Sequence, residues 1–262
     1  MQDHTLAGRR ALVTGSTGGI GLAIAGQLAA RGCAVLIHGL APPAEGDAIA
    51  RDLADRHGAA VTYRHADLSS LAEVEALMAA TDDGPDILIN NAVTRHLLPI
   101  EAFTPAAWEA DLAVNLSAPF HAIRLALPGM RARRWGRIVN MSSVYGLFGT
   151  AGRAGYVTTK TALIGLTRAV AMETLQDGIT CNAICPGSTP TPAIEARIAA
   201  GMAARGLTDR AAATAEFLAE KQPTRRFVSP EAVGGMVAFL CSPAGDDITG
   251  AALPIDGAWS AS

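Results

Sequence analysis

Charged residues are scarce in this chain: they make up 17% of its 262 residues, and the formal net charge is only −3. So small a charge excludes the strongly basic surface typical of proteins that bind nucleic acid or acidic membranes. Long apolar runs are lacking as well, and none approaches the roughly 20 residues that a membrane-spanning helix needs. We therefore expect neither a nucleic-acid partner nor a membrane partner.

Cysteine is also rare, and its spacing lacks the patterns of metal sites and redox pairs. Cys33, Cys181, Cys185 and Cys241 include no Cys-x-x-Cys pair and no combination with histidine that is typical of zinc binding. Cys181 and Cys185 lie in apolar sequence, which favours buried core thiols. The first ten residues contain no apolar core of a secretory signal. We therefore expect a cytoplasmic protein with reduced thiols and no bound metal.

What the chain has in abundance is hydrophobic sequence, 50% of all residues, in short β-rich runs that alternate with longer alanine-rich stretches. Near-continuous apolar strands separated by helices predict a parallel sheet covered on both faces, the doubly wound α/β or Rossmann fold. Strands are expected at residues 10–14, 34–38, 60–64, 86–90, 137–141, 179–184 and 252–255. Helices are expected at about 19–31, 49–57 and 155–174, a long, partly broken helical stretch at 105–133, and one more helix with Ser69 as its predicted N-cap.

The sequence contains no internal repeat and no long linker, so residues 1–262 are expected to form a single domain. One long excursion, at about 188–222, separates the sixth and seventh strands. It is rich in alanine and arginine and helical in propensity. Because it follows the carboxyl end of a strand, where such folds bind ligands, we predict that it forms a helical lid over the substrate.

A glycine-rich turn follows the first predicted strand and opens the first predicted helix. Gly15, Gly19 and Gly21 have the spacing G-x-x-x-G-x-G. Glycine allows a tight turn and a close approach of the backbone to a pyrophosphate, and the helix N-terminus stabilises that anion. With a strand before it and a helix after it, the motif predicts a dinucleotide site rather than a glycine-rich turn without a ligand.

Two further segments bear on the cofactor. Asn90-Asn91-Ala92 ends the fourth strand beside this turn and supports a cofactor bed, whereas Asp67 either contacts an adenine amine or begins a helix. The second strand ends in His38-Gly39-Leu40, with neither the acid that marks NAD nor the arginine that marks NADP. Since residues 16–18 also include no basic side chain to meet a 2′-phosphate, we favour NAD over NADP.

Tyr156 and Lys160 lie four residues apart in a predicted helix and therefore share one face. An ammonium beside a phenol favours the phenolate, which suits the tyrosine to general acid–base catalysis at a carbonyl or alcohol. Ser143 lies thirteen residues before the tyrosine, at the end of the fifth strand, with Ser142 as a rival hydroxyl. The pair alone is a common helical spacing, and it gains weight only from the motifs upstream.

Taken in order, these motifs resemble those of the short-chain dehydrogenase/reductase family, and the resemblance covers essentially the whole chain. They are Thr14-Gly15-x-x-x-Gly19-x-Gly21, Asn90-Asn91-Ala92, Asn115, Ser143, Tyr156-x-x-x-Lys160 and Pro186-Gly187 with Thr191-Pro192. The resemblance implies this fold, a nicotinamide cofactor and oxidoreductase chemistry without a metal. One departure is Val93, where the family usually has a glycine in the loop under the nicotinamide.

The resemblance also implies roles for individual residues. Tyr156 is expected to donate and accept the proton, with Lys160 binding the nicotinamide ribose. Ser143 is expected to hydrogen-bond the substrate oxygen, and Asn115 to hold a water in a proton relay. The expected cofactor contacts are Gly15, Thr17, Gly19, Ile20, Gly21, Asp67, Leu68, Asn91, Ala92, Tyr156, Lys160, Pro186, Gly187 and Thr191.

Within the family, the chain is most similar to the D-3-hydroxybutyrate dehydrogenase subgroup, whose second strand also lacks the ribose-binding acid; this again favours NAD. The predicted substrate contacts are Arg95, His96, Ser143, Tyr145, Arg153, Ser188, Arg197 and Trp259. Where the subgroup has glutamine, lysine and glutamine, this chain has Arg95, Arg153 and Arg197, and Ser188 replaces a tryptophan. A roomier, more cationic pocket is expected, for a hydroxy or keto acid that is larger or has a second anionic group, unless Arg95 or Arg197 faces solvent.

Other functions stay open at this point. A reductase of 3-oxoacyl thioesters or of sugar-derived ketones shares these motifs and would be expected to prefer NADPH. A non-catalytic dinucleotide-binding scaffold would be expected to have lost Tyr156 or Lys160, and both are present. The helix predicted at 155–174 is apolar on every side, which, with the family resemblance, predicts a homotetramer.

Overall fold

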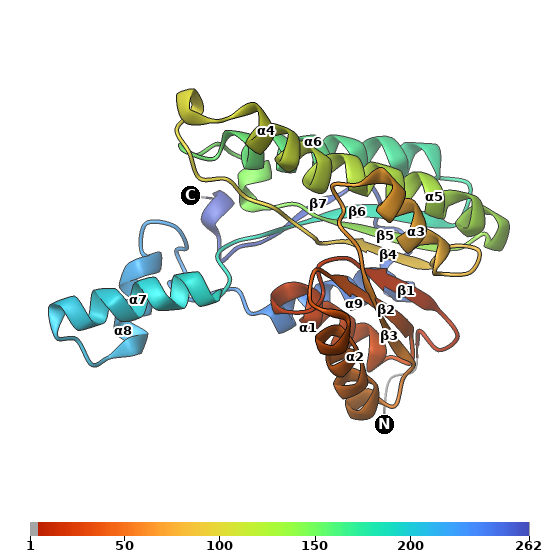
Figure 1. Cartoon of the computed structure of the whole chain (residues 1–262), viewed down its shortest axis with the longest axis horizontal. Helices are drawn as coiled ribbons and strands as arrows, with labels where there is room; N and C mark the ends of the chain where they lie inside the picture. Colours follow the sequence, from red (N-terminus) through yellow and green to blue (C-terminus); the bar gives the residue numbers. More distant parts are fainter. Residues whose placement is uncertain (1–4, 262) are drawn as a thin grey trace.

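A parallel sheet of seven strands forms the centre of the computed structural model, which describes residues 5–261 apart from the side chains of Pro192 and Ala193 (Figure 1). Its strands are β1 (Arg10–Val13), β2 (Ala34–Gly39), β3 (Val61–His65), β4 (Ile87–Asn90), β5 (Gly136–Met141), β6 (Ile179–Pro186) and β7 (Ala252–Ile255). They lie in the order β3-β2-β1-β4-β5-β6-β7, which reverses between β1 and β4. Doubly wound folds bind ligands beyond the strand ends at this reversal, and the predicted fold is confirmed.

Helices cover both faces of the sheet, because successive side chains of each strand point to opposite faces. Val13 and Ile37 belong to one core cluster, and their neighbours Leu12 and Leu36 belong to the other. The first cluster lies under α1 (Gly19–Ala29), α2 (Pro43–His57) and α9 (Pro230–Cys241). The second lies under α3 (Leu71–Ala79), α5 (Ala118–Arg133) and α6 (Ala154–Glu173). Burial on both faces explains why the strands are continuously apolar.

The structure corrects two predicted helix starts. The helix expected at 49–57 begins earlier, at Pro43, because proline at the first helical position has its φ preset and needs no hydrogen bond from its nitrogen. The N-cap of α3 is Ser70 rather than Ser69, since the Ser70 hydroxyl accepts the Glu73 N–H at 3.4 Å.

The long helical stretch expected at 105–133 is divided. A π-helical turn, Ala113–Ser117, separates α4 (Pro105–Leu112) from α5. Helix α9, whose N-cap is Ser229, was not expected from the sequence. The division matters for the site, because π-helical turns are frequent where a helix presents a functional side chain.

Two helices, α7 (Pro192–Arg205) and α8 (Arg210–Leu218), project from the carboxyl end of β6 away from the sheet (Figure 1). Residues 188–222 are named here the α7–α8 arm, and their predicted helical character is confirmed. The buried Gln222 joins the two ends of the arm: its Oε1 accepts the Ser188 N–H, and its Nε2 donates to the Arg226 carbonyl at 2.6 Å. The arm therefore leaves the body from one fixed base.

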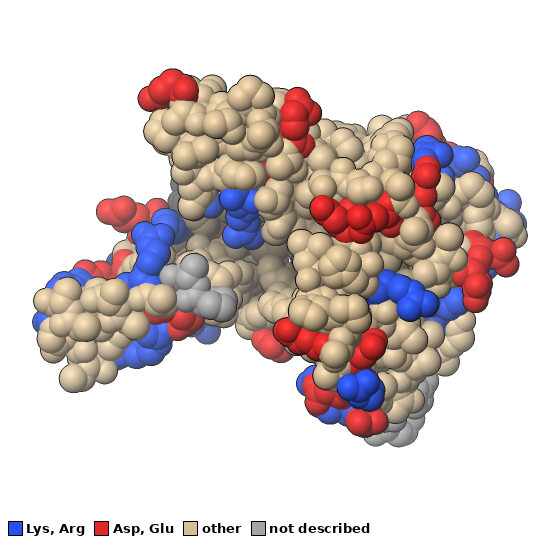
Figure 2. Space-filling view, in the orientation of Figure 1, with Lys and Arg blue, Asp and Glu red and all other residues tan. Residues whose placement is uncertain are grey.

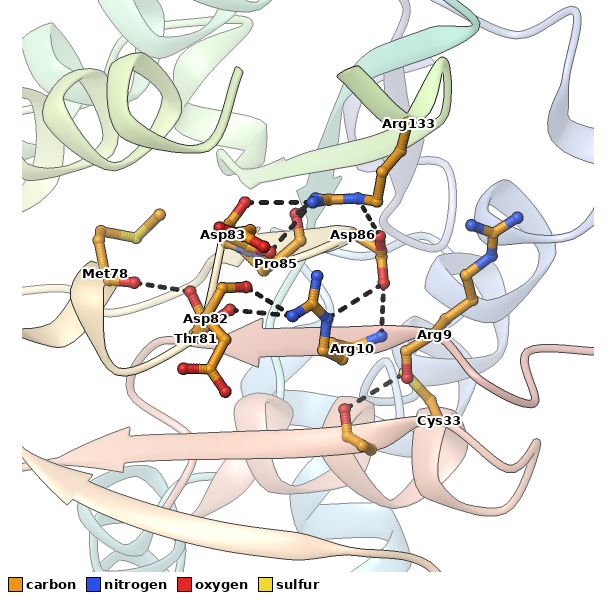
Figure 3. A network of polar contacts seen from close by, with 12 residues as sticks. Arg9, Arg10, Cys33, Met78, Thr81, Asp82, Asp83, Pro85, Asp86 and Arg133 are labelled. Atoms are coloured by element: carbon orange, nitrogen blue, oxygen red, sulfur yellow. Dashed lines mark hydrogen bonds and ion pairs between the residues drawn. The ribbon is translucent and has the colours of Figure 1, made fainter. Parts of the chain in front are cut away.

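Charged side chains at the amino ends of β1 and β4 form a separate network (Figure 3). Asp86 is only 3% exposed, and its Oδ2 accepts the backbone N–H of Arg10 at 2.9 Å. Its Oδ1 lies 2.7 Å from Nε of Arg133, at the end of α5. The buried Asp86 carboxylate thus joins β1 and the end of α5 to the start of β4. This network lies at the edge of the sheet opposite to the glycine turn.

Among residues 5–261, no helix combines the length and the apolar character that crossing a membrane requires. The same residues contain no group of three or more His, Cys, Asp or Glu side chains placed to hold a metal ion. All four cysteines are free and buried. Burial raises the pKa of the Cys33, Cys181 and Cys241 thiols to about 12, so they are protonated core side chains.

Candidate active site

The glycine turn after β1 is packed so closely that side chains are excluded from it. Gly15 has a φ of +61°, and a Cβ there would lie 2.8 Å from the Cα of Ala92. A Cβ on Gly21 would lie 2.2 Å from the Gly15 carbonyl oxygen. Gly19 also has a positive φ, of +54°, but has open space around it. Two of the three predicted glycines are thus required by close packing, and Gly19 by its backbone conformation.

The end of β4 is joined to this turn by a hydrogen-bond network that was not expected from the sequence. The Thr14 hydroxyl accepts the N–H of Asn91 at 2.9 Å and that of Ala92 at 3.0 Å. The Asn91 amide donates in return to the carbonyls of Thr14 and Gly15, at 2.9 and 2.8 Å. The predicted Asn91 and Ala92 therefore meet the turn, and Thr14 holds them there.

The N-terminus of α1 opens into the cavity beside this turn and fits an anion. Its N-cap is Gly18, no side chain caps it, and its first turn contains no acidic residue. Ile20, in that turn, lines the cavity. Uncapped N–H groups at a helix N-terminus attract negative charge, and the glycines let a ligand approach the backbone closely. These residues fit the pyrophosphate of a dinucleotide.

His38, at the end of β2, is a second feature that sequence reasoning missed. This residue is 2% exposed; its Nδ1 accepts the Gly15 N–H at 3.1 Å, and its Nε2 donates to the Ala66 carbonyl at 2.9 Å. Burial lowers the pKa of His38, which keeps the ring neutral as these two bonds require. A histidine at the end of an apolar strand beside a glycine turn was the available signal.

Gly39 follows at the position where an acid would mark NAD. A Cβ on Gly39 would lie 2.8 Å from the Thr17 side chain, so a larger residue there would require that side chain to move. The next residue, Leu40, is 66% exposed and apolar. The ribose end of the candidate cofactor site thus has neither an acid nor a base at these positions.

Asp67 and Leu68 lie after β3. The Asp67 Oδ1 accepts the Ser69 N–H at 2.9 Å, and hydrogen bonding by Ser69 lowers the pKa of this carboxyl. The sequence left two roles open for Asp67, contact with an adenine amine or a place at the start of a helix. In the structure its carboxylate forms a hydrogen-bonded turn before α3. Leu68 is buried in the core beneath α3.

Tyr156 and Lys160 lie on α6 and face the cavity together. The Lys160 ammonium is 5.7 Å from the centre of the Tyr156 ring and donates to the Met141 carbonyl, at the end of β5, at 2.7 Å. Burial, and after it the positive charge of Arg95, lowers the pKa of Lys160 from 10.5 to about 7. The predicted pair is thus brought together at the carboxyl edge of the sheet.

The two serines after β5 differ in the hydrogen bonds that their hydroxyls form. The Ser142 hydroxyl donates to the Lys160 carbonyl at 2.8 Å and so holds β5 to α6. The Ser143 hydroxyl accepts the Tyr145 N–H at 3.2 Å and keeps its own proton for another partner. Both line the cavity, and Ser143 is the one whose donor is free.

Asn115 lies in the π-helical turn and joins the loop after β4 to α6. Its Oδ1 accepts the Thr94 N–H at 2.9 Å, and its Nδ2 donates to the Thr94 carbonyl at 3.0 Å and to the Thr159 hydroxyl at 3.3 Å. It is buried and does not line the cavity. The structure therefore places it between Thr94 and Thr159, outside the cavity lining, and its predicted part in a proton relay stays a prediction.

The cavity at this edge has a volume of about 320 Å³ and collects most of the predicted site. The predicted residues that line it are Ile20, Asn91, Arg95, Ser143, Tyr145, Arg153, Tyr156, Lys160, Pro186, Gly187, Ser188, Thr191, Arg197 and Trp259. Arg95 and Arg197, whose direction the sequence left open, both line it. Lining residues that the sequence analysis did not predict include Leu97, Ile194, Phe217 and Lys221.

Aromatic rings support the charged groups of the cavity. The Arg95 guanidinium lies 5.2 Å from the centre of the Tyr156 ring, and that of Arg153 lies 5.3 Å from the Tyr145 ring. Tyr145 in turn meets Trp259 edge-on, with ring centres 5.3 Å apart. Such cation–π contacts hold both guanidinium groups without a carboxylate partner.

His96 is the predicted substrate residue that the structure places elsewhere. It does not line the cavity; its Nδ1 lies 2.9 Å from Oδ1 of Asp111, a carboxylate with no exposed surface. Asp111 lies on α4, far from His96 in the sequence, so nothing local signalled the pair. This contact anchors the loop that presents the neighbouring Arg95.

The lowered pKa of Lys160 should make the stability of the wild type depend on pH in a way that the Lys160→Met variant does not. Between pH 7 and pH 9 a lysine in the unfolded chain keeps its proton while buried Lys160 loses it, so the unfolded state binds more protons and stability rises with pH. The free energy of unfolding of the wild type relative to Lys160→Met should rise by about 2 kcal/mol over this interval.

Urea unfolding of the cofactor-free protein at both pH values measures this difference. The interval from pH 5 to pH 6 is the internal control, because Lys160 is protonated there in both states and the difference between the two proteins should stay constant. A difference that is equally constant from pH 7 to pH 9 would contradict the lowered pKa.

Known proteins resemble this chain over nearly its whole length. The family model described as enoyl-(acyl carrier protein) reductase matches residues 15–260. The D-beta-hydroxybutyrate dehydrogenase of Cupriavidus necator is 43% identical, over 98% of this chain and 99% of that protein, and its namesake of Rhizobium meliloti is 37% identical, over 97% and 99%. A solved structure of L-sorbose reductase from Gluconobacter frateurii, complexed with NADPH and L-sorbose, has a TM-score of 0.89, 29% identity and 97% coverage of both chains. With the glycine turn and the Ser143, Tyr156 and Lys160 constellation on the same sheet edge, these matches establish that the chain belongs to the short-chain dehydrogenase/reductase family of oxidoreductases.

Proposed function

We propose that this protein interconverts a secondary alcohol and a ketone on a small hydroxy or keto acid, with NAD as the cofactor. The observation that carries the proposal is one cavity lined by both an acid–base pair and cations without acidic partners. Tyr156 and Lys160 lie there with Ser143, and Arg95 and Arg153 line the same space. Arginine binds carboxylates through two parallel hydrogen bonds, which suits an acid substrate.

The proposed chemistry uses one proton carrier. When bound, the nicotinamide would supply an acceptor for the hydride of the carbinol C–H bond. Tyr156 takes the hydroxyl proton, and Ser143 donates a hydrogen bond to the substrate oxygen. Lys160 stabilises the phenolate through its charge and is proposed to bind the nicotinamide ribose. In the reverse direction Tyr156 returns the proton to the oxygen.

The residues around the candidate cofactor site support NAD. A 2′-phosphate is usually met by an arginine near the end of β2. Here Gly39 and Leu40 occupy that position, and residues 16–18 include no basic side chain. The relatives named D-beta-hydroxybutyrate dehydrogenase support a small hydroxy acid as substrate. The small Ser188 and the arginines of the cavity support one with more bulk or charge than hydroxybutyrate.

A second candidate is a reductase of sugar-derived ketones or 3-oxoacyl thioesters. It is favoured by the structural neighbour, an L-sorbose reductase complexed with NADPH, and by the reductase description of the family model. Its discriminating feature is the cofactor, because NADPH needs a basic side chain for its 2′-phosphate. A catalytically silent scaffold fits less well, since Tyr156 and Lys160 stand together in the cavity.

We also infer a homotetramer. The family resemblance supports it, as do exposed apolar side chains on two neighbouring helices of one sheet face: Phe120 on α5 is 47% exposed and Met172 on α6 is 70% exposed. Large apolar side chains in such positions favour contact with a further copy of the chain.

Oxidation of a panel of hydroxy acids with NAD and with NADP tests the proposal. We expect NAD to give a kcat/KM at least about tenfold higher than NADP, because no cation meets the extra phosphate. The absorbance of the reduced cofactor measures both rates on the same protein. Preference for NADPH, with reduction of sugars or acyl thioesters and no oxidation of hydroxy acids, would favour the second candidate instead.

A further inference from the structure

Three cations meet at the arm side of the cavity. Arg153 is the N-cap residue of α6, Arg197 lies on α7 and Lys221 follows α8, and all three line the cavity. The Arg197 guanidinium and the Lys221 ammonium lie 5.4 and 4.9 Å from the centre of the same ring, that of Phe217. Burial, and then the charges of Arg197 and Arg153, lower the pKa of Lys221. These three side chains, named here the arm cluster, therefore act on one another.

The arm cluster has no acidic partner within the cavity. None of the lining residues is an aspartate or a glutamate. Two acids of the arm are paired with other arginines: Glu195 with Arg210, and Glu216 with Arg205 at 2.6 Å. Glu220 acts on Lys221 from the neighbouring position in the chain, outside the lining. Like charges gathered without a counter-ion repel one another, and an anion between them would relieve that repulsion.

Arg95 is a further cation of the same cavity, beside Tyr156 and Lys160. It lies over the Tyr156 ring, and its charge acts on Lys160, whereas Arg153 and Arg197 act on Lys221. Figure 2 shows Lys and Arg side chains on both walls of the hollow between the α7–α8 arm and the body of the molecule. One carboxylate would offset only one of the positive charges of Arg95 and the arm cluster and would leave the others without an anion.

We propose that the substrate has two carboxylates, one bound by Arg95 beside Tyr156 and one bound by the arm cluster, with the reacting carbon between them. This inference rests on the proposed function and narrows its substrate to a small hydroxy or keto dicarboxylate. The reaction is that of the proposed function: the hydroxy diacid loses a hydride to NAD and a proton to Tyr156 and becomes the keto diacid.

Binding without turnover tests the arm cluster directly. Glutarate and its monomethyl ester share one skeleton and differ by one negative charge. With NAD present, we expect glutarate to raise the Tm at concentrations about tenfold to a hundredfold lower than the ester, the effect of one charge-assisted contact. Arg197→Gln should remove most of this preference.

Arg205→Gln is the matched control, because Arg205 lies on the same helix but pairs with Glu216 outside the cavity. Its preference for glutarate should equal that of the wild type. Equal stabilisation by glutarate and its ester in the wild type would overturn the proposal, and so would a preference that survives Arg197→Gln.

Turnover separates this inference from the function on which it rests. We expect 3-hydroxyglutarate to be oxidised with a kcat/KM about tenfold to a hundredfold above that of its monomethyl ester. Equal oxidation of both by NAD overturns the second carboxylate and leaves the proposed function standing. If neither is oxidised while glutarate still binds preferentially, the diacid site stands and the proposed chemistry is wrong.

Discussion

Replacing Tyr156 by phenylalanine should lower kcat/KM for alcohol oxidation by about a hundredfold to ten-thousandfold, the range that general acid–base catalysis supplies. The change removes one hydroxyl and keeps the ring, so the contacts of Arg95 and Lys160 with that ring persist. Without the phenol, the hydroxyl proton of the substrate has no acceptor at the site where the hydride leaves. Steady-state oxidation with saturating NAD measures the loss.

Tyr145→Phe supplies the matched control for this experiment. The two tyrosine rings are neighbours, with centres 6.5 Å apart, and both line the cavity. Removal of the Tyr145 hydroxyl should cost about tenfold or less, the effect of one neutral hydrogen bond to the substrate. Comparable losses in the two variants would show that general damage to the cavity, rather than loss of the proton carrier, explains the effect.

A Tyr156→Phe variant with wild-type turnover would point to Lys160 instead. The pKa of Lys160 is lowered to about 7, which by itself suits a general base at neutral pH. The geometry argues for the tyrosine, because the Lys160 ammonium donates to the Met141 carbonyl and so is held to β5. The Phe variant therefore decides between two groups that both have the chemistry for the task.

Local sequence predicted those parts of the fold and site that depend on local patterns. Continuously apolar strands follow from burial on both faces, and the glycine turn follows from the closeness of Gly15 and Gly21 to other backbone. The spacing of Tyr156 and Lys160 follows from the helical repeat. Each of these features is contained in a short window of residues, which is why the sequence alone indicated them.

The features that escaped prediction depend on residues far apart in the chain. Asp111 is one residue of an ordinary helix in the sequence, yet it is fully buried against His96. His38 is one residue of an apolar strand, yet it holds the glycine turn and the end of β3. Lys221 is one charge of a polar segment in the sequence, yet its ammonium and the Arg197 guanidinium both lie over the Phe217 ring. Only the tertiary structure brings these pairs together.

The second large effect is expected at the glycine turn, where Gly21→Ala should weaken NAD binding by about a hundredfold or more, which corresponds to about 2.7 kcal/mol. The added Cβ would lie 2.2 Å from the Gly15 carbonyl oxygen and 2.6 Å from the Asn91 amide nitrogen. A backbone oxygen cannot rotate away, so α1 must move. That movement displaces the helix N-terminus from the pyrophosphate and breaks the Asn91 bonds that hold the turn to β4.

Gly18→Ala, in the same turn, isolates this cause. Gly18 has an extended backbone, with a φ of −170°, and a Cβ there has no atom within 4 Å. Both substitutions restrict the unfolded chain alike, so they should differ only through the packing at Gly21. Calorimetric titration with NAD should show near wild-type affinity for Gly18→Ala, and circular dichroism should show that both variants are folded. If the two variants bind NAD equally well, the close packing of α1 on Gly15 and Asn91 is not what forms the dinucleotide site.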